Sequence, residues 1–250
     1  MTDLSSVGVV VLAAGKGTRL NCVDIPKVML EIGGKPIVSY TVETLRKVGF
    51  KKEQICLVVG FCKEKVMDYF KDTVSYAVQT DLRGTANAAF IGMQTLPKNI
   101  TQVLVLGGDD SAFYRPDTIR DFINRHEQRQ AKLSLLVATV EQPIGLGRIF
   151  RHENGEIEII EKEYLTEEQK LIKEISTGTF IFDRKWFEEM YPTMPPMQKL
   201  NEYGLPTALA VARKMRATYQ IVKLEHPDEW FGINTPEEYA EANKRKQITK

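Results

Sequence analysis

Residues Leu12–Pro36 read LAAGKGTRLNCVDIPKVMLEIGGKP, in which the end of a strand runs into a Gly-rich turn. The apolar β-formers Val7–Leu12 stop abruptly at the small residues Ala13–Gly17. Small residues let a backbone turn sharply and approach a ligand without Cβ clashes. Successive N–H groups in such a turn hold an anion, and Lys16 and Arg19 add fixed positive charge. The stretch predicts a loop that wraps a nucleoside triphosphate.

The turn fits neither of the two best-known phosphate-binding motifs. Gly15-Lys16-Gly17-Thr18 does not match G-x-x-x-x-G-K-[ST], and no third glycine follows at the dinucleotide-binding spacing. Such glycines can also serve turn geometry alone. About eight residues on, Lys27 supplies another cation on a backbone stiffened by Pro26. The rest of the chain must decide between a phosphate site and a plain turn.

Composition and charge limit the classes of protein to which the chain can belong. The 250 residues are enough for one large α/β domain, and 43% hydrophobic with 27% charged residues is typical of a globular chain. Lys and Arg number 34 against 33 Asp and Glu, so the net charge of +1 creates no field toward nucleic acid or a membrane. We expect neither as a partner, and an anionic ligand must be held by local charge.

The cysteines and the N-terminus indicate the compartment. Cys22, Cys56 and Cys62 are an odd set without a C-x-x-C pair, which fits a reducing environment better than a disulfide framework. The N-terminus lacks the pattern of a leader, and no apolar run approaches the roughly 18 residues of a membrane span. We therefore expect a cytoplasmic protein. The choice between a monomer and a homo-oligomer stays open.

Strand and helix alternate through residue 106, which predicts βαβ units and a parallel sheet. The expected strands are Val7–Leu12, Ile55–Val59, Val74–Val78 and Val103–Leu106, with a short extended segment at Val28–Ile32 and helices beginning at Pro36, Lys63 and Thr85. Ligands of such sheets bind beyond the C-terminal strand ends. Polar clusters at 13–19, 79–85 and 107–110 all fall there. They predict one ligand site at that edge.

The second half is expected to extend the same sheet and to build a lobe across a cleft. Its expected helices are Pro116–Arg129, Thr166–Lys173, Leu205–Met215 and Pro236–Lys246, and its expected strands are Leu133–Val140, Ser176–Phe182 and Ala217–Leu224. Arg148–Arg151 and Glu156–Glu161 flank Asn154-Gly155, a pair that favours a hairpin. No linker interrupts the chain. We expect a single domain over 1–250, with a nucleotide-binding half of about 1–115 and a sugar-binding half of about 116–250.

Asp109 is a candidate magnesium ligand because it follows an apolar strand at a turn. Magnesium needs only one or two protein oxygens plus substrate phosphates, so a sparse ligand set is expected. Asn234 can supply a neutral second oxygen. Each residue also has a plain explanation: Asp109 can cap a turn, and Asn234 can precede the terminal helix. On their own, these two residues do not decide the question.

Further candidates follow the strands and the hairpin. Gln79 can read a base edge with its amide, and Gly84-Thr85 can let a base lie against the backbone. Gly147 and Glu161 flank the proposed cleft, where the Glu161 carboxylate can accept hydrogen bonds from sugar hydroxyls. As isolated residues these are more often strand ends, caps and surface polar groups. The three histidines have no metal-ligand spacing and no nucleophile–base pair is evident, which argues against zinc and Ser/His/Asp chemistry.

Taken together, the motifs resemble those of the sugar-1-phosphate nucleotidyltransferases, or sugar-nucleotide pyrophosphorylases. The resemblance is strongest to the N-terminal uridyltransferase domain of the bacterial bifunctional N-acetylglucosamine-1-phosphate uridyltransferase/glucosamine-1-phosphate acetyltransferase. It covers nearly the whole chain. The motifs occur in family order: LAAGKGTRL, PKVM and GGKPI, then Gln79 with GTA at 84–86, GGD at 107–109, GRI at 147–149, TEEQKLIKEISTG up to Gly178, and GIN at 232–234.

The resemblance implies a Rossmann-like α/β fold with a mixed, mostly parallel sheet and a small sugar-side β lobe. It implies that the loop Leu12, Ala13, Ala14, Gly15, Lys16, Gly17, Thr18 wraps the triphosphate of an NTP, with UTP expected, and that Arg19 and Lys27 contact its phosphates. By the same resemblance Gln79, Gly84 and Thr85 hold the base, Asp109 and Asn234 ligate Mg²⁺, and Gly147, Glu161 and Ser176 face the sugar-1-phosphate. Arg19, Lys27 and Asp109 are its implied catalytic residues.

Several positions depart from the family pattern, most of them on the sugar side. Gly107 stands where tyrosine is common, and Asp110-Ser111 replaces an apolar residue and proline. Ser176 takes the place of an asparagine that touches the N-acetyl sugar, Glu163 that of a lysine, and EYGLPT at 202–207 that of EYYLTD. No hexapeptide repeat of an acetyltransferase β-helix follows. The sugar therefore stays undetermined.

The implied reaction is attack of a sugar phosphate oxygen on the α-phosphorus of the NTP, with loss of pyrophosphate. A phosphate oxygen is nucleophilic at neutral pH, so catalysis reduces to positioning and charge stabilisation. Two alternatives remain open. One is a cytidylyltransferase acting on a non-sugar phosphate, which shares the LAAGxGxR opening. The other is a non-catalytic module that binds a nucleotide sugar.

Overall fold

The apolar segment that precedes the Gly-rich loop is the central strand of the molecule. In the computed structural model, which describes residues 3–199 and 201–248, β1 (Val7–Ala13) lies between β4 (Ile55–Val59) and β6 (Gln102–Gly107), parallel to both. β5 (Ser75–Val78) pairs with β4, also in parallel. β1, β4 and β6 carry almost only buried apolar side chains, as expected for strands covered on both faces, whereas the edge strand β5 is only partly buried. The parallel half-sheet expected from the alternation is confirmed.

The second half of the chain completes the same sheet, in the order β11-β7-β10-β6-β1-β4-β5. β10 (Glu174–Asp183) runs antiparallel to both β6 and β7 (Leu133–Thr139), and β11 (Tyr219–Lys223) is parallel to β7. The register of β10 against β7 shifts between Ser176 and Phe180, so the strand bends there. The sheet is therefore mixed and mostly parallel, as the family resemblance implied.

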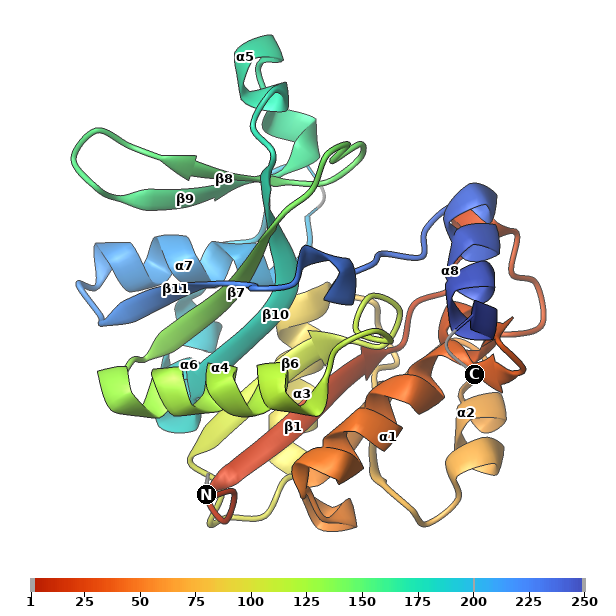
Figure 1. Cartoon of the computed structure of the whole chain (residues 1–250). Helices are drawn as coiled ribbons and strands as arrows, with labels where there is room; N and C mark the ends of the chain where they lie inside the picture. The colour runs from red at the N-terminus through yellow and green to blue at the C-terminus, as the bar shows by residue number, and fades with distance from the viewer. Residues whose placement is uncertain (1–2, 200, 249–250) are drawn as a thin grey trace.

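Helices cover both faces of the sheet (Figure 1). Val9 and Val11 of β1 pack with α1 (Ile37–Val48), α2 (Lys63–Phe70) and α4 (Pro116–Arg129). Val10 points to the opposite face, which is covered by α3 (Thr85–Thr95), α6 (Arg184–Met190) and α7 (Leu205–Lys214). The alternation of side chains along the strand thus divides the core into two layers.

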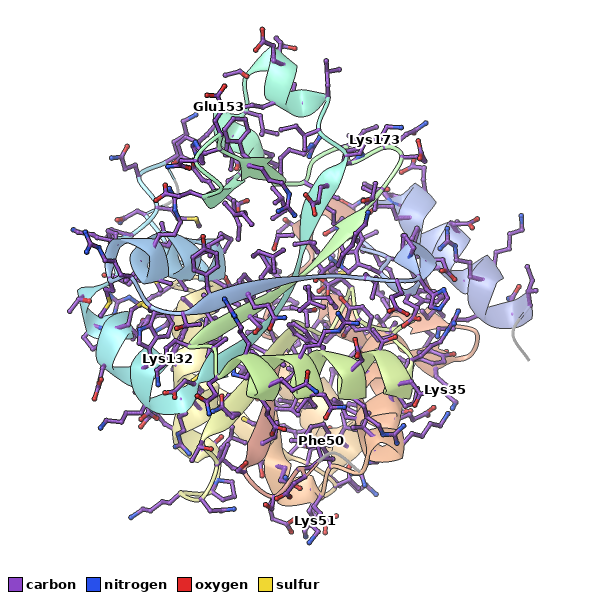
Figure 2. The ribbon with its side chains drawn as sticks, turned by 60° about the vertical axis from the view of Figure 1, so that its left-hand side comes forward. Lys35, Phe50, Lys51, Lys132, Glu153 and Lys173 are labelled. Carbon is purple, nitrogen blue, oxygen red and sulfur yellow. The ribbon has the colours of Figure 1, made fainter. Side chains whose placement is uncertain are left out.

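A small lobe projects from the sheet where β7 ends and β10 begins (Figure 1). It contains the hairpin β8 (Arg148–Arg151) and β9 (Ile157–Ile160) and the single turn α5 (Glu167–Lys170). Figure 2 shows Glu153 and Lys173 in this lobe, at the opposite end of the molecule from Phe50 and Lys51. The lobe stands where the sequence placed the second wall of a cleft.

The C-terminal helix packs against the segment that follows the Gly-rich loop. α8 (Pro236–Ile248) contacts β2 (Glu31–Ile32), which pairs with β3 (Lys35–Pro36). Ile32, Ile233 and Ala242 share a separate apolar cluster. The Gly33 N–H donates to Asn243 Oδ1 across 2.8 Å. The C-terminal helix therefore lies beside the segment Glu31–Pro36, which follows the Gly-rich loop (Figure 1).

Two expected elements need correction, and one helix was missed. Val28–Ile32 is extended only at Glu31–Ile32, because Lys27–Met29 forms a 3-10 turn closed by Met29 N–H donating to Pro26 O at 2.8 Å. The helix expected over Thr166–Lys173 is one turn, capped by Thr166. α6 was not predicted at all. The remaining 3-10 turns are Thr18–Leu20, Lys52–Gln54, Lys162–Tyr164, Tyr191–Thr193 and Pro227–Glu229.

No helix within residues 3–199 and 201–248 is both long enough and apolar enough to cross a membrane.

Candidate active site

A cavity of about 390 Å³ opens at the C-terminal edge of the sheet, between the two halves of the chain. It lies beside the ends of β1 and β6 and is bounded on the far side by the lobe and by β10. Seven of the residues singled out in the sequence line it: Leu12, Thr85, Asp109, Gly147, Glu161, Ser176 and Asn234. The fold thus brings residues from both halves to one place, as expected for a site at this edge.

The Gly-rich loop leaves β1 and packs its tip against Lys27. Gly17 has φ +71°, and a Cβ there would lie 2.6 Å from Lys27 Cβ, so only glycine fits this close approach. Gly15, by contrast, faces open space. The Lys16 ammonium lies over the Phe61 ring, 5.3 Å from its centroid. The loop therefore presents exposed backbone at Gly15 while its second glycine anchors it.

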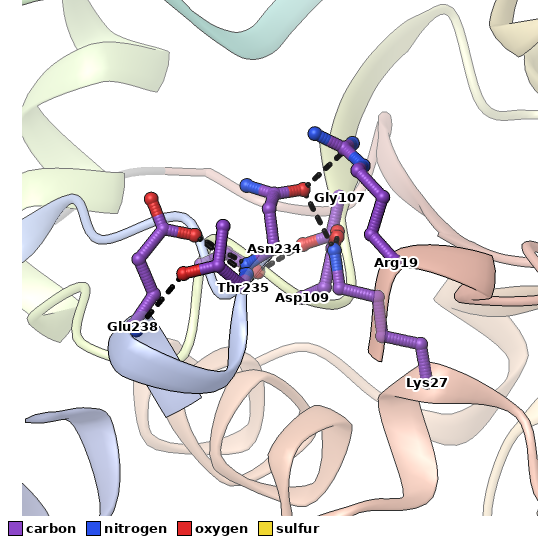
Figure 3. Close-up of polar contacts among 8 residues, drawn as sticks. Arg19, Lys27, Gly107, Asp109, Asn234, Thr235 and Glu238 are labelled. Carbon is purple, nitrogen blue, oxygen red and sulfur yellow. Dashed lines mark hydrogen bonds and ion pairs between the residues drawn. The ribbon is translucent and has the colours of Figure 1, made fainter. Parts of the chain in front are cut away.

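Four side chains from distant segments meet next to this loop (Figure 3). The buried Lys27 ammonium forms an ion pair with Asp109 Oδ2 and donates to Asn234 Oδ1 at 2.9 Å. The Arg19 guanidinium donates to the same Asn234 oxygen at 3.2 Å. The sequence separations of 82 and 207 residues show that only the tertiary fold assembles this group. We call Arg19, Lys27, Asp109 and Asn234 the charged cluster.

The charged cluster has the donor set of a magnesium site. Asp109 Oδ2 and Asn234 Oδ1 both accept from one cation, the Lys27 ammonium, so their oxygens already converge on a positive charge. A carboxylate and an amide oxygen are hard ligands of the kind magnesium prefers. Across residues 3–199 and 201–248, no group of three or more His, Cys, Asp or Glu side chains could hold a metal. These two residues fit Mg²⁺ only with substrate phosphates completing the coordination.

Asn234 is held in place by the start of α8. Its N–H and that of Thr235 both donate to Glu238 Oε2, at 2.6 and 3.0 Å, and the Glu238 N–H donates to Thr235 Oγ1 at 3.2 Å (Figure 3). This reciprocal arrangement is a capping box. Thr235 caps the terminal helix. The helix cap and the cluster contact are therefore compatible, because the cap uses the Asn234 backbone and leaves its side chain for the cluster.

Asp110 is a second carboxyl group beside Asp109, and it lacks a full set of partners. Its Oδ1 is buried with no hydrogen-bond partner. Burial, followed by the neighbouring Asp109 charge, raises the pKa of Asp110 well above its usual range. A Cβ on Gly107 would lie 2.6 Å from that same Oδ1. The two departures from the family pattern are thus physically coupled, because Asp110 occupies space that a side chain at 107 would need.

Gln79 and Gly84 lie at the other end of the nucleotide-binding half. Gln79 is buried, and its amide nitrogen donates to Gly84 O at 3.2 Å and to Asn87 Oδ1 at 2.9 Å. Gly84 has φ +100°, and a Cβ there would lie 2.5 Å from Tyr203 O. Thr85 Oγ1 accepts from the Leu205 N–H at 2.9 Å. The sequence singled out Gln79, Gly84 and Thr85 but missed their contacts with Asn87 and with residues 203–205.

On the lobe side, Gly147, Glu161 and Ser176 face the cavity. A Cβ on Gly147 would lie 3.0 Å from Ile160 O, so the loop and β9 are in close contact there. Burial, together with nearby Glu163, raises the pKa of Glu161. The Gly178 N–H donates to Ser176 Oγ at 3.3 Å. Trp230, Glu202 and Lys162 also line this wall and were not predicted, since none of them follows a strand end in the first half.

The chain is similar to known nucleotidyltransferases over nearly its whole length. The family model described as "Nucleotidyl transferase" matches residues 8–248. The bifunctional protein GlmU of Bacillus cytotoxicus is 34% identical over 226 residues, 90% of this chain and 48% of that protein. The GlmU of Syntrophotalea carbinolica is 36% identical over 94% of this chain and 50% of its own length. The chain thus spans about half the length of these curated relatives.

Two solved structures share the fold. A putative glucose-1-phosphate thymidylyltransferase from Bacillus anthracis, in complex with a sucrose, superposes with a TM-score of 0.78 at 20% identity, covering 96% of this chain and 95% of that one. A UDP-glucose pyrophosphorylase complexed with UDP-glucose gives 0.77 at 22% identity, covering 97% and 99%. The sheet topology and the flanking helices described above are therefore those of this group of structures.

Proposed function

The chain belongs to the nucleotidyl transferase family, and from that premise we propose that it transfers a uridylyl group from UTP to a sugar-1-phosphate and releases pyrophosphate. The observation that carries the proposal is the charged cluster: two cationic side chains and two oxygen ligands, gathered from four segments at the C-terminal edge of the sheet. The reactants are two anions. A site that brings them together must supply positive charge where they meet.

The nucleotide would occupy the first half of the cleft. The loop Leu12–Thr18, with its exposed backbone at Gly15, would wrap the triphosphate, and Arg19 and Lys27 would contact its phosphates. Gly84 and Thr85 would carry the base on their backbone, with Gln79 beside them. The loop meets the charged cluster through Gly17 and Lys27, which places phosphate binding and the reacting centre next to each other.

Asp109 and Asn234 would hold Mg²⁺, as the convergence of their oxygens on one ammonium group supports. When bound, the ion would neutralise phosphate charge in the transition state. Lys27 would then have its ammonium group free for a phosphate oxygen, because its contact with Asp109 competes with metal binding. Arg19, which shares the Asn234 oxygen, would contact the phosphates from the opposite side.

The acceptor would lie against the lobe, with Gly147, Glu161 and Ser176 facing its sugar. One of its phosphate oxygens forms a bond to the α-phosphorus as the bond to pyrophosphate breaks, in line. No proton has to be removed from the attacking oxygen at neutral pH. The residues of this chain therefore contribute positioning and charge, not general-base catalysis. The buried and half-buried free cysteines are compatible with a cytoplasmic enzyme.

A pyrophosphate-release matrix tests the proposal. UTP, CTP, dTTP, ATP and GTP are each combined with glucose-, N-acetylglucosamine-, galactose- and mannose-1-phosphate and with a polyol phosphate, in the presence and absence of Mg²⁺. We expect release with UTP and at least one sugar phosphate, only with Mg²⁺. Release only with CTP and the polyol phosphate would assign the chain to the cytidylyltransferases. Nucleotide binding without any release would make it a binding module.

A further inference from the structure

The amide of Gln79 is fixed in one orientation before any ligand arrives. An amide nitrogen has two N–H donors, and both of those on Gln79 are used inside the protein, by Gly84 O at 3.2 Å and Asn87 Oδ1 at 2.9 Å. No described residue donates to Gln79 Oε1 at hydrogen-bond distance. The only atom of this amide left for a ligand is therefore an acceptor.

The Gly84 carbonyl disfavours the reverse orientation, but its bond to the amide is the longer of the two, so Asn87 is also needed to hold the amide in place. Rotating the Gln79 amide would place its oxygen against the Gly84 carbonyl, and neither oxygen carries a hydrogen. Asn87 could follow such a rotation by flipping its own amide, because its other partner, the Tyr191 hydroxyl at 2.8 Å, can donate as well as accept. The Gly84 carbonyl can only accept a hydrogen bond, so the two orientations of the Gln79 amide are not equivalent. Asn87 then provides the second acceptor that holds the chosen orientation.

The Asn87 side chain is itself held by a rigid neighbour. Asn87 is buried on α3, and Tyr191 comes from the 3-10 turn after α6, 104 residues further along the chain. The Tyr191 ring stacks on Phe90 of the same helix, with centroids 4.5 Å apart and planes inclined by 20°. The hydroxyl that meets Asn87 is therefore positioned by ring packing.

We infer that Asn87 is a positioning residue that, through Gln79, makes the base site select nucleobases with an N3–H donor. Uracil and thymine carry that hydrogen between two carbonyl groups. Cytosine presents a lone pair at the same atom, and its amino group lies one position further round the ring. An acceptor fixed at Gln79 Oε1 bonds the first pair of bases and repels cytosine in the same pose. This inference rests on the proposed function, in which Gln79 lies beside the base.

Nucleotide binding separates the inference from the proposed reaction. Dissociation constants of UTP and CTP are measured by calorimetry with the intact chain and with Asn87→Leu, Asn87→Asp and Tyr191→Phe. Asn99→Ala is the matched control, because that asparagine is exposed and donates to Ser5 O far from the cleft. We expect the CTP-to-UTP ratio of dissociation constants to fall by at least about tenfold in Asn87→Leu, since a site loses discrimination when its fixed polar partner is freed.

Asn87→Asp should restore the ratio to within about threefold of the parent, because a carboxylate accepts from both Gln79 and the tyrosine hydroxyl. Tyr191→Phe should give an intermediate ratio. In a Gln79→Ala background, Asn87→Leu should leave the ratio unchanged. Equal affinity of the parent chain for UTP and CTP, or an unaltered ratio in both Asn87→Leu and Tyr191→Phe, overturns the inference. A ratio that changes as expected in a chain that releases no pyrophosphate supports the inference and rejects the proposed reaction.

Discussion

The two ends of the cleft differ in how completely the protein satisfies its own polar groups. At the end that contains Gln79, both amide donors of Gln79 are bonded, and Asn87 is bonded on both sides. At the other end, Asp110 Oδ1 is buried without a partner, and burial raises the pKa of Glu161. A polar network that is complete before binding is rigid and selective. A buried carboxyl oxygen without a partner, such as Asp110 Oδ1, instead awaits a ligand or is held at a cost in stability.

The charged cluster stands between these ends and has features of both. Its members bond one another, yet the Lys27 contact occupies the oxygens that a metal needs. We interpret this as a site that is assembled in advance but has to exchange partners when substrate binds. The polar groups around Gln79 are already paired, whereas those of the charged cluster have to change partners. We therefore expect substitutions at these places to differ in the size of their effects.

The largest effect is expected for Asp109→Asn. The amide keeps the shape of the side chain but removes the charged oxygen that converges with Asn234 on the Lys27 ammonium. We expect turnover to fall by at least about 10³-fold while the melting temperature stays within a few degrees, because metal-assisted charge stabilisation is lost. Asp117→Asn is the control, as its side chain is 94% exposed on α4. Near-normal pyrophosphate release by Asp109→Asn would reject the metal assignment.

Lys27→Ala tests the exchange of partners at the centre. Turnover should fall by roughly 10²-fold, the scale of losing one positioned donor to developing charge. Binding of Mn²⁺ in the absence of nucleotide should become tighter, because Asp109 and Asn234 lose the ammonium that occupies their oxygens. Lys27→Met keeps the stem that packs on Gly17 and should behave in the same way. A loss of less than about threefold would reduce Lys27 to a structural lysine.

Much of the fold follows from local patterns in the sequence. Pro116–Arg129 is helical over the expected range, since Pro116 can begin a helix and Ile119, Phe122 and Ile123 recur on one face. Ile55–Val59 is a strand over the expected range as well. The missed helix α6 follows β10 without a break, because Asp183 ends the strand and caps the helix through the Trp186 N–H. No turn residue separates the strand from the helix. The sequence therefore does not show where the spacing of apolar residues changes from that of a strand to that of a helix.

Candidate site residues that come directly after a strand could be predicted from the sequence, and the others much less so. Asp109 and Gln79 come directly after strands, and the fold places each at the expected edge. Asn87 looks like one polar residue in a helix of small side chains, and its partner Tyr191 lies 104 residues away. Contacts of that separation depend on the packing of α3 against α6, which no local pattern encodes. The roles assigned to the site residues remain predictions.

Gly84→Ala tests how closely the backbone at residue 84 packs against the backbone of Tyr203. A Cβ at residue 84 would lie 2.5 Å from Tyr203 O and 2.8 Å from Tyr203 N, both of them backbone atoms. Gly155→Ala is a matched control, because Gly155 also has positive φ but no atom within 4 Å. We expect Gly84→Ala to lower the free energy of unfolding by about 1–3 kcal/mol more than the control, and to raise the KM for UTP. If denaturant titrations showed equal losses of unfolding free energy in the two variants, residue 84 would have room for a Cβ.

The smallest effect is expected at the other end, from Asp110→Asn. Burial and Asp109 raise the pKa of Asp110 in the folded chain, so above pH 3.8 the unfolded carboxyl group ionises first and folding loses free energy as pH rises through the folded pKa. The amide removes this penalty. We expect the variant to melt about 2–4 °C above the parent at pH 8, near 1 kcal/mol, and to gain less at pH 4. An increase in melting temperature that does not depend on pH, or that Asp117→Asn reproduces, would show that ionisation of Asp110 does not destabilise the fold.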